Sequence, residues 1–421
     1  MSIAFENRNE ATQLARTLHR SQRNRRINSL LLIAPLLLYV LLTFILPIAI
    51  MFYKAVENSE VITAFPQTTT QLGQWNSTNP DELPPNAIYL TFVKEIAGAP
   101  RSDVGEAARR LNYEISGYRS LLTSTLRKVR ELPANIEANE NAKGFLLDID
   151  KRWADPAFWH AMQRSSASYT PYYMLAALDL RLNDGGQLVQ VPEEQRTYVD
   201  ILVRTIKIAA IVTIVCVILG YPLANLMLTA PNPFAIVLMI AVMLPFWTSL
   251  LARTSAWIVL LQREGLINSF LGYLGLINQP LELIFNTTGL YIVMVHMMLP
   301  FMVLPIYSTM KGIPPQYMKA SASLGANPLR SFWEVYLPMT LPGVGAGALL
   351  TFIVTTGYYI TPSLVGSARD QMLGYFIAFF ANTTINWGMA SALGIILLFC
   401  TLCIYLVATR TVGVRQLAGL K

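Results

Sequence analysis

The chain has 421 residues, of which 53% are hydrophobic and only 14% charged, and its mean hydropathy is +0.43. Soluble globular domains carry about 25% charged residues, so this composition excludes an ordinary soluble domain and indicates a membrane protein. We interpret the net charge of +7 as the loop charge that orients membrane proteins, not as a nucleic-acid-binding surface.

Long uncharged runs predict membrane-spanning helices, because about 20 apolar residues cross the hydrocarbon core. The run from Ile208 to Ala252 is long enough for two crossings, and "APNP" at Ala230–Pro233 supplies the turn between them. The sequence therefore predicts an all-α membrane protein with six transmembrane helices. The expected spans are 29–53, 204–229, 233–261, 284–310, 341–365 and 386–410.

Charged flanks predict the orientation of these helices, because cytoplasmic loops retain Lys and Arg. Basic residues crowd the start of the first span, namely Arg16, Arg20, Arg23, Arg25 and Arg26. Arg410 ends the last span, and Arg415 and Lys421 follow it. We therefore expect a basic cytoplasmic N-terminus over 1–28 and a cytoplasmic tail over 411–421, which in a bacterial cell corresponds to a location in the inner membrane. The first span is too long, and lacks the small-residue cleavage site, for a removed signal peptide.

Residues 54–199 form the one large polar region, and this orientation places them in the periplasm. Within it, "DVGEAARRLNYEISGYRSLLTSTLRKV", Asp103–Val129, repeats apolar residues at roughly helical spacing. We predict a mainly helical insert between the first and second spans, without disulfides because all three cysteines fall in predicted spans. The expected apolar face comprises Ala107, Leu111, Ile115, Tyr118, Leu122 and Leu126, and a loop marked by Ser77, Asn79, Pro80, Pro84 and Pro85 precedes it.

Several residues that resemble functional groups have ordinary explanations. Cys400 and Cys403 form a CxxC one helical turn apart in an apolar span, where packing is the expected role. His296 has no nearby acidic partner, which argues against a proton relay or a metal site. Arg253 is expected to reach the membrane interface, with an anionic ligand as the alternative. No GxxxxGK[ST], HExxH or GxSxG occurs, so we expect no catalytic, metal or cofactor site in this chain.

The stretch "YMKASASLGANPLRSFWEVYLPMTLPG", Tyr317–Gly343, carries charges between two uncharged runs. It predicts two short helices that meet at a bend, the first over Gln316–Leu324 with an apolar surface suited to a partner's groove. At Ser331, on the second helix, a change to Ala is expected to be milder than a change of Gly325 to Val, because it alters neither backbone preference nor bulk much. The helix signals are Pro314 and Pro315 at the first start, Gly325 at its left-handed end, Asn327 and Pro328 at the second start, and Pro338 at its limit.

This stretch resembles the cytoplasmic loop of permease subunits of importer-type ABC transporters. That loop has Glu-Ala-Ala, a Gly three residues later, nine residues, then an aliphatic residue, any residue and Leu-Pro. Lys319 stands where the family usually has Glu, and Ser321 where it has Ala. The matching positions are Ala320, Gly325, Val335, Leu337 and Pro338.

Two further stretches resemble the spermidine/putrescine permease branch of this family. They are "LPFWTSLLARTSAWIVLLQREGLIN", Leu244–Asn268, and "MMLPFMVLPIYSTMKGIP", Met297–Pro314. The resemblance covers the first span and nearly everything after residue 200. The insert is larger than that branch usually carries.

The resemblance implies the type I ABC importer permease fold and a division of labour. Two permease subunits, here expected to differ, would form the pathway in the lipid bilayer, two ATPase subunits would hydrolyse ATP, and a periplasmic binding protein would deliver the solute. The chain itself is then not an enzyme and has no nucleic-acid partner. Within the core 200–410, the coupling loop 311–340 would contact the ATPase through Tyr317, Lys319, Ala320, Ser321, Leu324, Gly325, Asn327, Pro328, Val335, Leu337 and Pro338.

The solute implied is a polyamine, with another small organic solute such as an opine or an amino-acid derivative as the alternative. A secondary transporter is disfavoured because the predicted spans lack acidic residues. A pathway for a cation should offer carboxylates or aromatic faces. The aromatic and hydroxyl candidates are Trp247, Thr248, Tyr291, Thr355, Tyr358, Tyr359 and Thr361.

Overall fold

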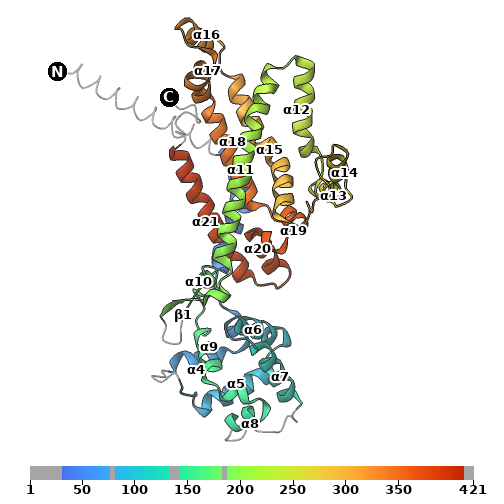
Figure 1. Cartoon of the computed structure of the whole chain (residues 1–421). Coiled ribbons are helices and arrows are strands. Elements are labelled where there is room, and N and C mark those ends of the chain that lie inside the picture. The colour runs from blue at the N-terminus through green and yellow to red at the C-terminus, as the bar shows by residue number, and fades with distance from the viewer. Residues whose placement is uncertain (1–30, 76–80, 132–141, 183–186, 412–421) are drawn as a thin grey trace, which may run out of the picture. The chain divides into compact units, whose positions relative to one another are not determined.

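The computed structural model describes residues 31–75, 81–131, 142–182 and 187–411, in two compact units divided between Lys54 and Ala55 (Figure 1). The predicted N-terminal segment 1–28, the tail from residue 412 and the loop residues Ser77, Asn79 and Pro80 lie outside the described residues.

The first unit contains one apolar helix, Leu31–Lys54, which is long enough to cross a membrane and occupies the predicted first span. Its middle is a π-helical turn, η1 (Leu41–Ile45), and α2 (Leu46–Lys54) follows. In this turn the amide of Leu46 donates to the carbonyl of Leu41, one residue farther back than in an α-helix. Pro47 has no amide hydrogen to donate. The wider turn immediately before it lets the helix continue through the proline.

The second unit begins with the insert, which is built from short helices around an aromatic core (Figure 1). The rings of Tyr89 and Trp159 lie 4.5 Å apart, and those of Phe92 and Trp153 5.0 Å apart. The prediction of a mainly helical insert is confirmed. Its helices are α3 (Glu60–Ala64), α4 (Pro66–Gln74), α5 (Asn86–Gly98), α6 (Arg101–Glu114), α7 (Tyr118–Arg130), α8 (Ala142–Ile149), η2 (Lys151–Ala154), α9 (Pro156–Arg164), α10 (Tyr172–Ala176) and η3 (Glu193–Gln195).

The apolar face predicted over Asp103–Val129 is divided between two helices. The chain turns at Gly117, whose φ of +91° suits glycine, and Asn112 accepts hydrogen bonds there from the amides of Gly117 and Arg119. The predicted side chains nevertheless pack into the core, because each helix contributes part of the face. Ala107, Leu111, Tyr118 and Leu122 are fully buried, and Ile115 and Leu126 are partly buried against them.

A short antiparallel hairpin joins the insert to the membrane core. It pairs β1 (Leu180–Leu182) with β2 (Leu188–Gln190), with Arg181 opposite Val189. Just before β1, the carboxylate of Asp179 accepts hydrogen bonds from the amides of Thr197, Tyr198 and Val199 at 2.8–3.2 Å. These amides belong to the first turn of α11 (Tyr198–Thr229), so an insert residue caps a membrane helix.

The membrane core centres on α11, α15 (Thr287–Lys311) and α18 (Leu337–Gly357), which pack side by side (Figure 1). Small residues allow the close approach of α18 to α15: a side chain at Gly343 would collide with Thr309, and one at Gly347 with Met302. The remaining elements are α12 (Asn232–Trp247), α13 (Leu250–Leu261), α14 (Leu266–Tyr273), α16 (Gln316–Ser323), α17 (Pro328–Ser331), η4 (Phe332–Tyr336), α19 (Ile360–Val365), η5 (Ala368–Asp370), α20 (Leu373–Asn382) and α21 (Trp387–Thr411).

Within the described chain, five helices are long and apolar enough to span a membrane, and a sixth span is possible if a bent pair counts as one. The pair is α12 with α13–α14, which meet at 110°, so the span predicted at 233–261 is not a straight helix. The starts of α11 and α15 lie at one end of the core, since Thr205 and Thr287 bond to the backbone of Leu373 and the carboxylate of Asp370. The chain leaves α11 at the other end and must return before α15, which supports counting the pair as a span.

The fifth predicted span, 341–365, is wrong at both ends. The helix begins at Pro328, runs through η4 into α18 and ends at Gly357, and α19 is a separate short helix. Tyr358 leaves the helical conformation with a ψ of 133°.

Candidate functional site

The segment between α15 and α18 is a compact helical hairpin. α16 ends in a left-handed residue, Gly325, with a φ of +86°, as predicted. The amide of Ala326 donates to the carbonyl of Ser321 at 3.2 Å, and that of Gly325 to Ala322 at 3.0 Å. These two bonds satisfy carbonyls that would otherwise lack partners at the helix end. The turn after α16 therefore has one defined geometry.

The second helix of the hairpin begins with the predicted cap. The side chain of Asn327 accepts a hydrogen bond from the amide of Arg330 at 2.8 Å, and Pro328 occupies the first helical position. The prediction that Pro338 limits this helix is wrong. In η4 the amide of Leu337 donates to the carbonyl of Phe332, which forms the same wide turn before a Leu-Pro pair as in the first span. Val335, Leu337 and Pro338 therefore lie in the start of a continuous helix and not in a loop.

A buried hydrogen bond joins the two helices of the hairpin. The hydroxyl oxygens of Ser321 and Ser331 lie 2.8 Å apart, and both residues are buried. Sequence reasoning missed this pair and treated Ser331 as a position for a mild control substitution. The structure makes it a poor control, because losing one hydroxyl would leave the other buried without its partner.

The tip of the hairpin exposes large apolar side chains. Leu324 is 89% exposed, and Tyr317, Leu329 and Trp333 are also exposed. Lys319 is also exposed, on α16. Arg330 pairs with Glu334 at 2.9 Å on the surface. In Figure 1, α16 and α17 lie at the opposite end of α11 and α18 from the insert. An exposed apolar tip on a rigid hairpin suits a protein partner.

The structure does not bring the predicted pathway residues together around one cavity. Trp247 is 85% exposed and lies with Thr248 where α12 breaks before α13. Tyr291 and Tyr358 are half-buried against the core of the bundle, and Tyr359 is exposed.

The two buried threonines among the pathway candidates, Thr355 and Thr361, have structural hydrogen bonds. Thr355 is fully buried and donates to the carbonyl of Thr351 in its own helix at 2.6 Å. Thr361 is fully buried 3.4 Å from the hydroxyl of Thr254. Neither hydroxyl is open to a solute in this conformation.

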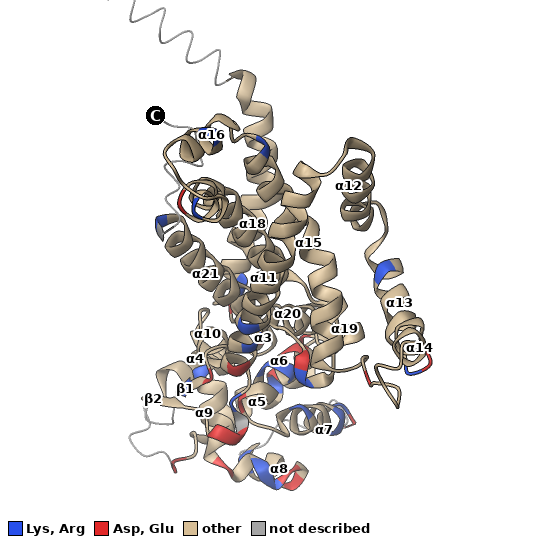
Figure 2. Ribbon diagram, turned by 45° about the horizontal axis from the view of Figure 1, so that its top comes forward, with Lys and Arg blue, Asp and Glu red and all other residues tan. Residues whose placement is uncertain are grey.

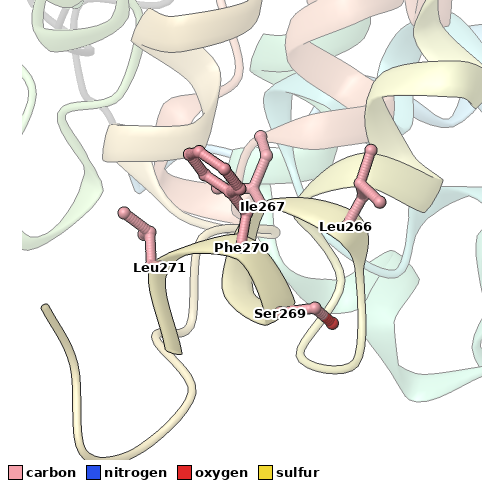
Figure 3. A pocket seen from close by; sticks show the side chains of 5 residues that line it. All are labelled: Leu266, Ile267, Ser269, Phe270 and Leu271. Carbon is pink, nitrogen blue, oxygen red and sulfur yellow. The ribbon is translucent and has the colours of Figure 1, made fainter. Parts of the chain in front are cut away.

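An apolar hollow of about 470 Å³ lies instead on α14 (Figure 3). Ile267 and Phe270 point to one side of the helix, whereas Ser269 points away from them (Figure 3). None of the predicted pathway residues lines this hollow, which is formed by Leu266, Ile267, Ser269, Phe270 and Leu271.

The other singled-out residues have ordinary surroundings. His296 accepts a hydrogen bond from the indole of Trp257, with Nε1 and Nδ1 3.1 Å apart. Cys400 and Cys403 are free thiols. Among the residues that the structure describes, no cluster of His, Cys, Asp and Glu could hold a metal ion.

One buried acid of the membrane core was not singled out from the sequence. Asp370 accepts hydrogen bonds from the hydroxyls of Thr287 at 2.7 Å and Ser367 at 2.6 Å. Burial alone would raise the pKa of this carboxyl group, but these hydrogen bonds outweigh it and hold the pKa below its usual value. Ser367 three residues before Asp370 is a capping-box spacing, and that signal was available in the sequence.

Comparison with known proteins agrees with this architecture. Residues 208–412 match the family described as "Binding-protein-dependent transport system inner membrane component". The spermidine/putrescine transport system permease protein PotB of Escherichia coli (strain K12) is 32% identical over 200 residues, covering 48% of this chain and 73% of that protein. PotB of Haemophilus influenzae is 31% identical over 233 residues, covering 53% and 82%. The inner membrane ABC transporter permease protein YdcU of Escherichia coli (strain K12) is 38% identical over 192 residues, which cover 42% of this chain and 59% of that protein.

The match to the family begins ten residues inside α11, so the insert lies outside it. The matched part contains the bent pair, the α16–α17 hairpin and α21, in the order in which the structure presents them. The chain therefore belongs to the family of binding-protein-dependent transport system inner membrane components, and it is a membrane-embedded permease subunit of an ABC importer.

Proposed function

We propose that this chain is one of two different permease subunits of an importer for polyamines such as spermidine or putrescine. The substrate class is supported by the relatives named spermidine/putrescine permeases, two of which are 31–32% identical and 73–82% covered. Two copies of a separate ATPase would supply the energy, and an extracytoplasmic binding protein would deliver the solute.

The coupling role rests on the α16–α17 hairpin. Its end at Gly325, its cap at Asn327 and the Ser321–Ser331 bond restrict it to one shape, while Leu324 and Tyr317 face outward. We infer that these exposed side chains enter a groove of the ATPase. Because η4 joins α17 to α18 without a break, a push on the hairpin would be transmitted directly into a membrane helix.

The proposed orientation places the hairpin and both termini in the cytoplasm, and the insert in the periplasm. The support is the arginine-rich segment before the first span, together with two basic residues in the last turns of membrane helices. These are Lys311 at the end of α15 and Arg410 at the end of α21. In this orientation Trp247, Thr248 and Tyr359, the exposed members of the pathway candidates, are the ones we assign to the solute route.

The test is transport by the complete importer in vesicles that contain both permease subunits and the ATPase. Addition of spermidine-loaded binding protein should stimulate ATP hydrolysis and produce uptake of labelled spermidine. A Gly325→Val change should lower uptake at least tenfold, because the φ of +86° strains a β-branched residue although nothing lies within 4 Å of a Cβ there.

The matched control is Gly325→Asn, since asparagine tolerates the left-handed conformation and should retain most of the uptake. Membrane levels of the three proteins are compared by immunoblot. Full transport by the Val variant would rule out a coupling role for this turn, and the absence of spermidine uptake by the unaltered complex would rule out the substrate.

A further inference from the structure

A wide, arginine-rich hollow lies where the insert meets the membrane core. It has a volume of about 1160 Å³ and is formed by α6, α7 and the loop between α20 and α21. Figure 2 shows blue, basic segments on α6 and α7, the helices that contribute most of its lining. Glu106 and Glu131 are the acidic residues among those that line it. The arginines are Arg101, Arg109, Arg119, Arg127 and Arg130.

The floor of the hollow belongs to the membrane core. The guanidinium of Arg109 donates to the carbonyl of Thr384 at 3.2 Å, and Ile385 exposes an apolar side chain beside it. A side chain at Gly388, at the start of α21, would collide with the ring of Tyr173. Whatever occupies the hollow would therefore contact the insert and the α20–α21 connection together.

The charge of the hollow excludes the proposed solute as its occupant, because five arginines against two glutamates repel a polyamine cation. Its dimensions exclude a single small anion. Small-molecule sites span about 300–1,000 Å³ and enclose their ligand, whereas this hollow is larger and open. Arg119 and Arg127 are eight residues apart on α7, about 12 Å along the helix axis, which is too far for one phosphate or carboxylate to contact both.

We propose that this hollow is the docking surface for an acidic segment of the binding protein on which the importer depends. The inference rests on the proposed function and names a contact for its partner. The proposed orientation places the insert in the compartment from which the binding protein delivers the solute, and a row of surface carboxylates on that protein would match arginines spread along two helices. Arg101, Arg119 and Arg127 form no ion pair within the described chain, so they are available for such a partner.

The test uses the complete importer in nanodiscs of zwitterionic lipid, titrated with spermidine-loaded binding protein. The readout is the binding-protein concentration that gives half-maximal ATP hydrolysis. The double variant Arg119→Glu/Arg127→Glu should raise this concentration at least tenfold, because opposite charges accelerate association and like charges oppose it. The matched control, Lys94→Glu/Lys151→Glu, reverses two exposed charges of the insert outside the hollow and should change it less than twofold.

A second measurement does not depend on charge reversal. A photo-crosslinking residue in place of Thr123, which lines the hollow, should capture the binding protein, whereas the same residue in place of Lys94 should not. Equal behaviour of the hollow and control variants, or capture only at position 94, would overturn the proposal.

The remaining outcomes separate this inference from others. If the double variant matters only in nanodiscs that contain anionic lipid, and not in zwitterionic ones, a lipid headgroup occupies the hollow and protein docking is overturned. If binding protein never stimulates the unaltered importer, the proposed function fails and this inference falls with it. If stimulation is normal and identical in both variants, only the docking surface is wrong.

Discussion

The Ser321–Ser331 pair gives the hairpin a stability that neither serine provides alone. Ser331→Ala should leave the Ser321 hydroxyl buried without its partner, at a cost of about 1–3 kcal/mol. Replacing both serines by Ala should be nearly neutral, because no polar group is then left unpaired. The measurement is hydrogen exchange of the α16 amides followed by mass spectrometry. We expect exchange at least fivefold faster in the single variant and close to the unaltered rate in the double variant.

Ser323→Ala is the matched control, since Ser323 is exposed and bonds only within its own helix. A double variant that exchanges as fast as the single one would mean that the two hydroxyls do not stabilise each other.

Local signals predicted Gly325 and Asn327 correctly, because a left-handed helix end and a cap depend on a few neighbouring residues. The serine pair depends on the angle between two helices, which no short stretch of sequence encodes.

At the scale of elements, a buried arginine joins three parts of the insert. Arg110 on α6 is 2% exposed, donates through Nε to Asn58 at 2.9 Å, and lies 4.4 Å above the ring of Tyr172 on α10. Its Nη2 lies 3.0 Å from Glu114, without the geometry of a hydrogen bond. Burial alone would lower the pKa of this guanidinium, but Tyr173 and Glu114 outweigh that effect and hold it above its usual value.

Arg110→Met should therefore destabilise the insert by about 3 kcal/mol. This is the lower end of the range for breaking a buried ion pair, because Glu114 keeps its second partner, Arg164. Limited proteolysis of the purified full chain in detergent should show much faster cleavage between α6 and α10. Arg119→Met, a change of the same size at an exposed position of α7, is the control. Equal protection of both variants would show that Arg110 is not a structural link.

The helices themselves were largely predictable, and the exceptions have identifiable causes. Apolar runs near 20 residues located α11, α15 and α21, because burial in lipid requires such runs. Prolines misled the prediction at Pro338, since a wide turn before the proline keeps the helix intact. The break before α13 had a signal that was overlooked: Ser249 accepts a hydrogen bond from the amide of Ala252 and so caps a new helix.

At the scale of the whole molecule, the bent pair decides how many times the chain crosses the membrane. Alkaline phosphatase, which is active only outside the cytoplasm, is fused to truncated chains ending at Glu131, Thr229 or Gly275. We expect activity at Glu131, none at Thr229 and activity at Gly275, because α12 to α14 must return the chain to the end where α15 begins. An inactive Gly275 fusion would mean that the pair re-enters on one side, and an inactive Glu131 fusion would reverse the proposed orientation.

The wide turn η4 also sets the direction in which the α16–α17 hairpin projects from α18. A π-helical turn is an α-helix with one surplus residue, and each residue of an α-helix advances the chain by about 100° around the axis. The surplus residue lies between Phe332 and Tyr336, immediately before α18. The nine residues that separate Gly325 from Val335 include part of this turn. Their number therefore sets the rotation angle, around the axis of α18, at which α16 projects from the helix. A chain shortened there by one residue would lose the wide turn that carries the helix through Pro338, and it would also aim Leu324 about 100° away from its present direction.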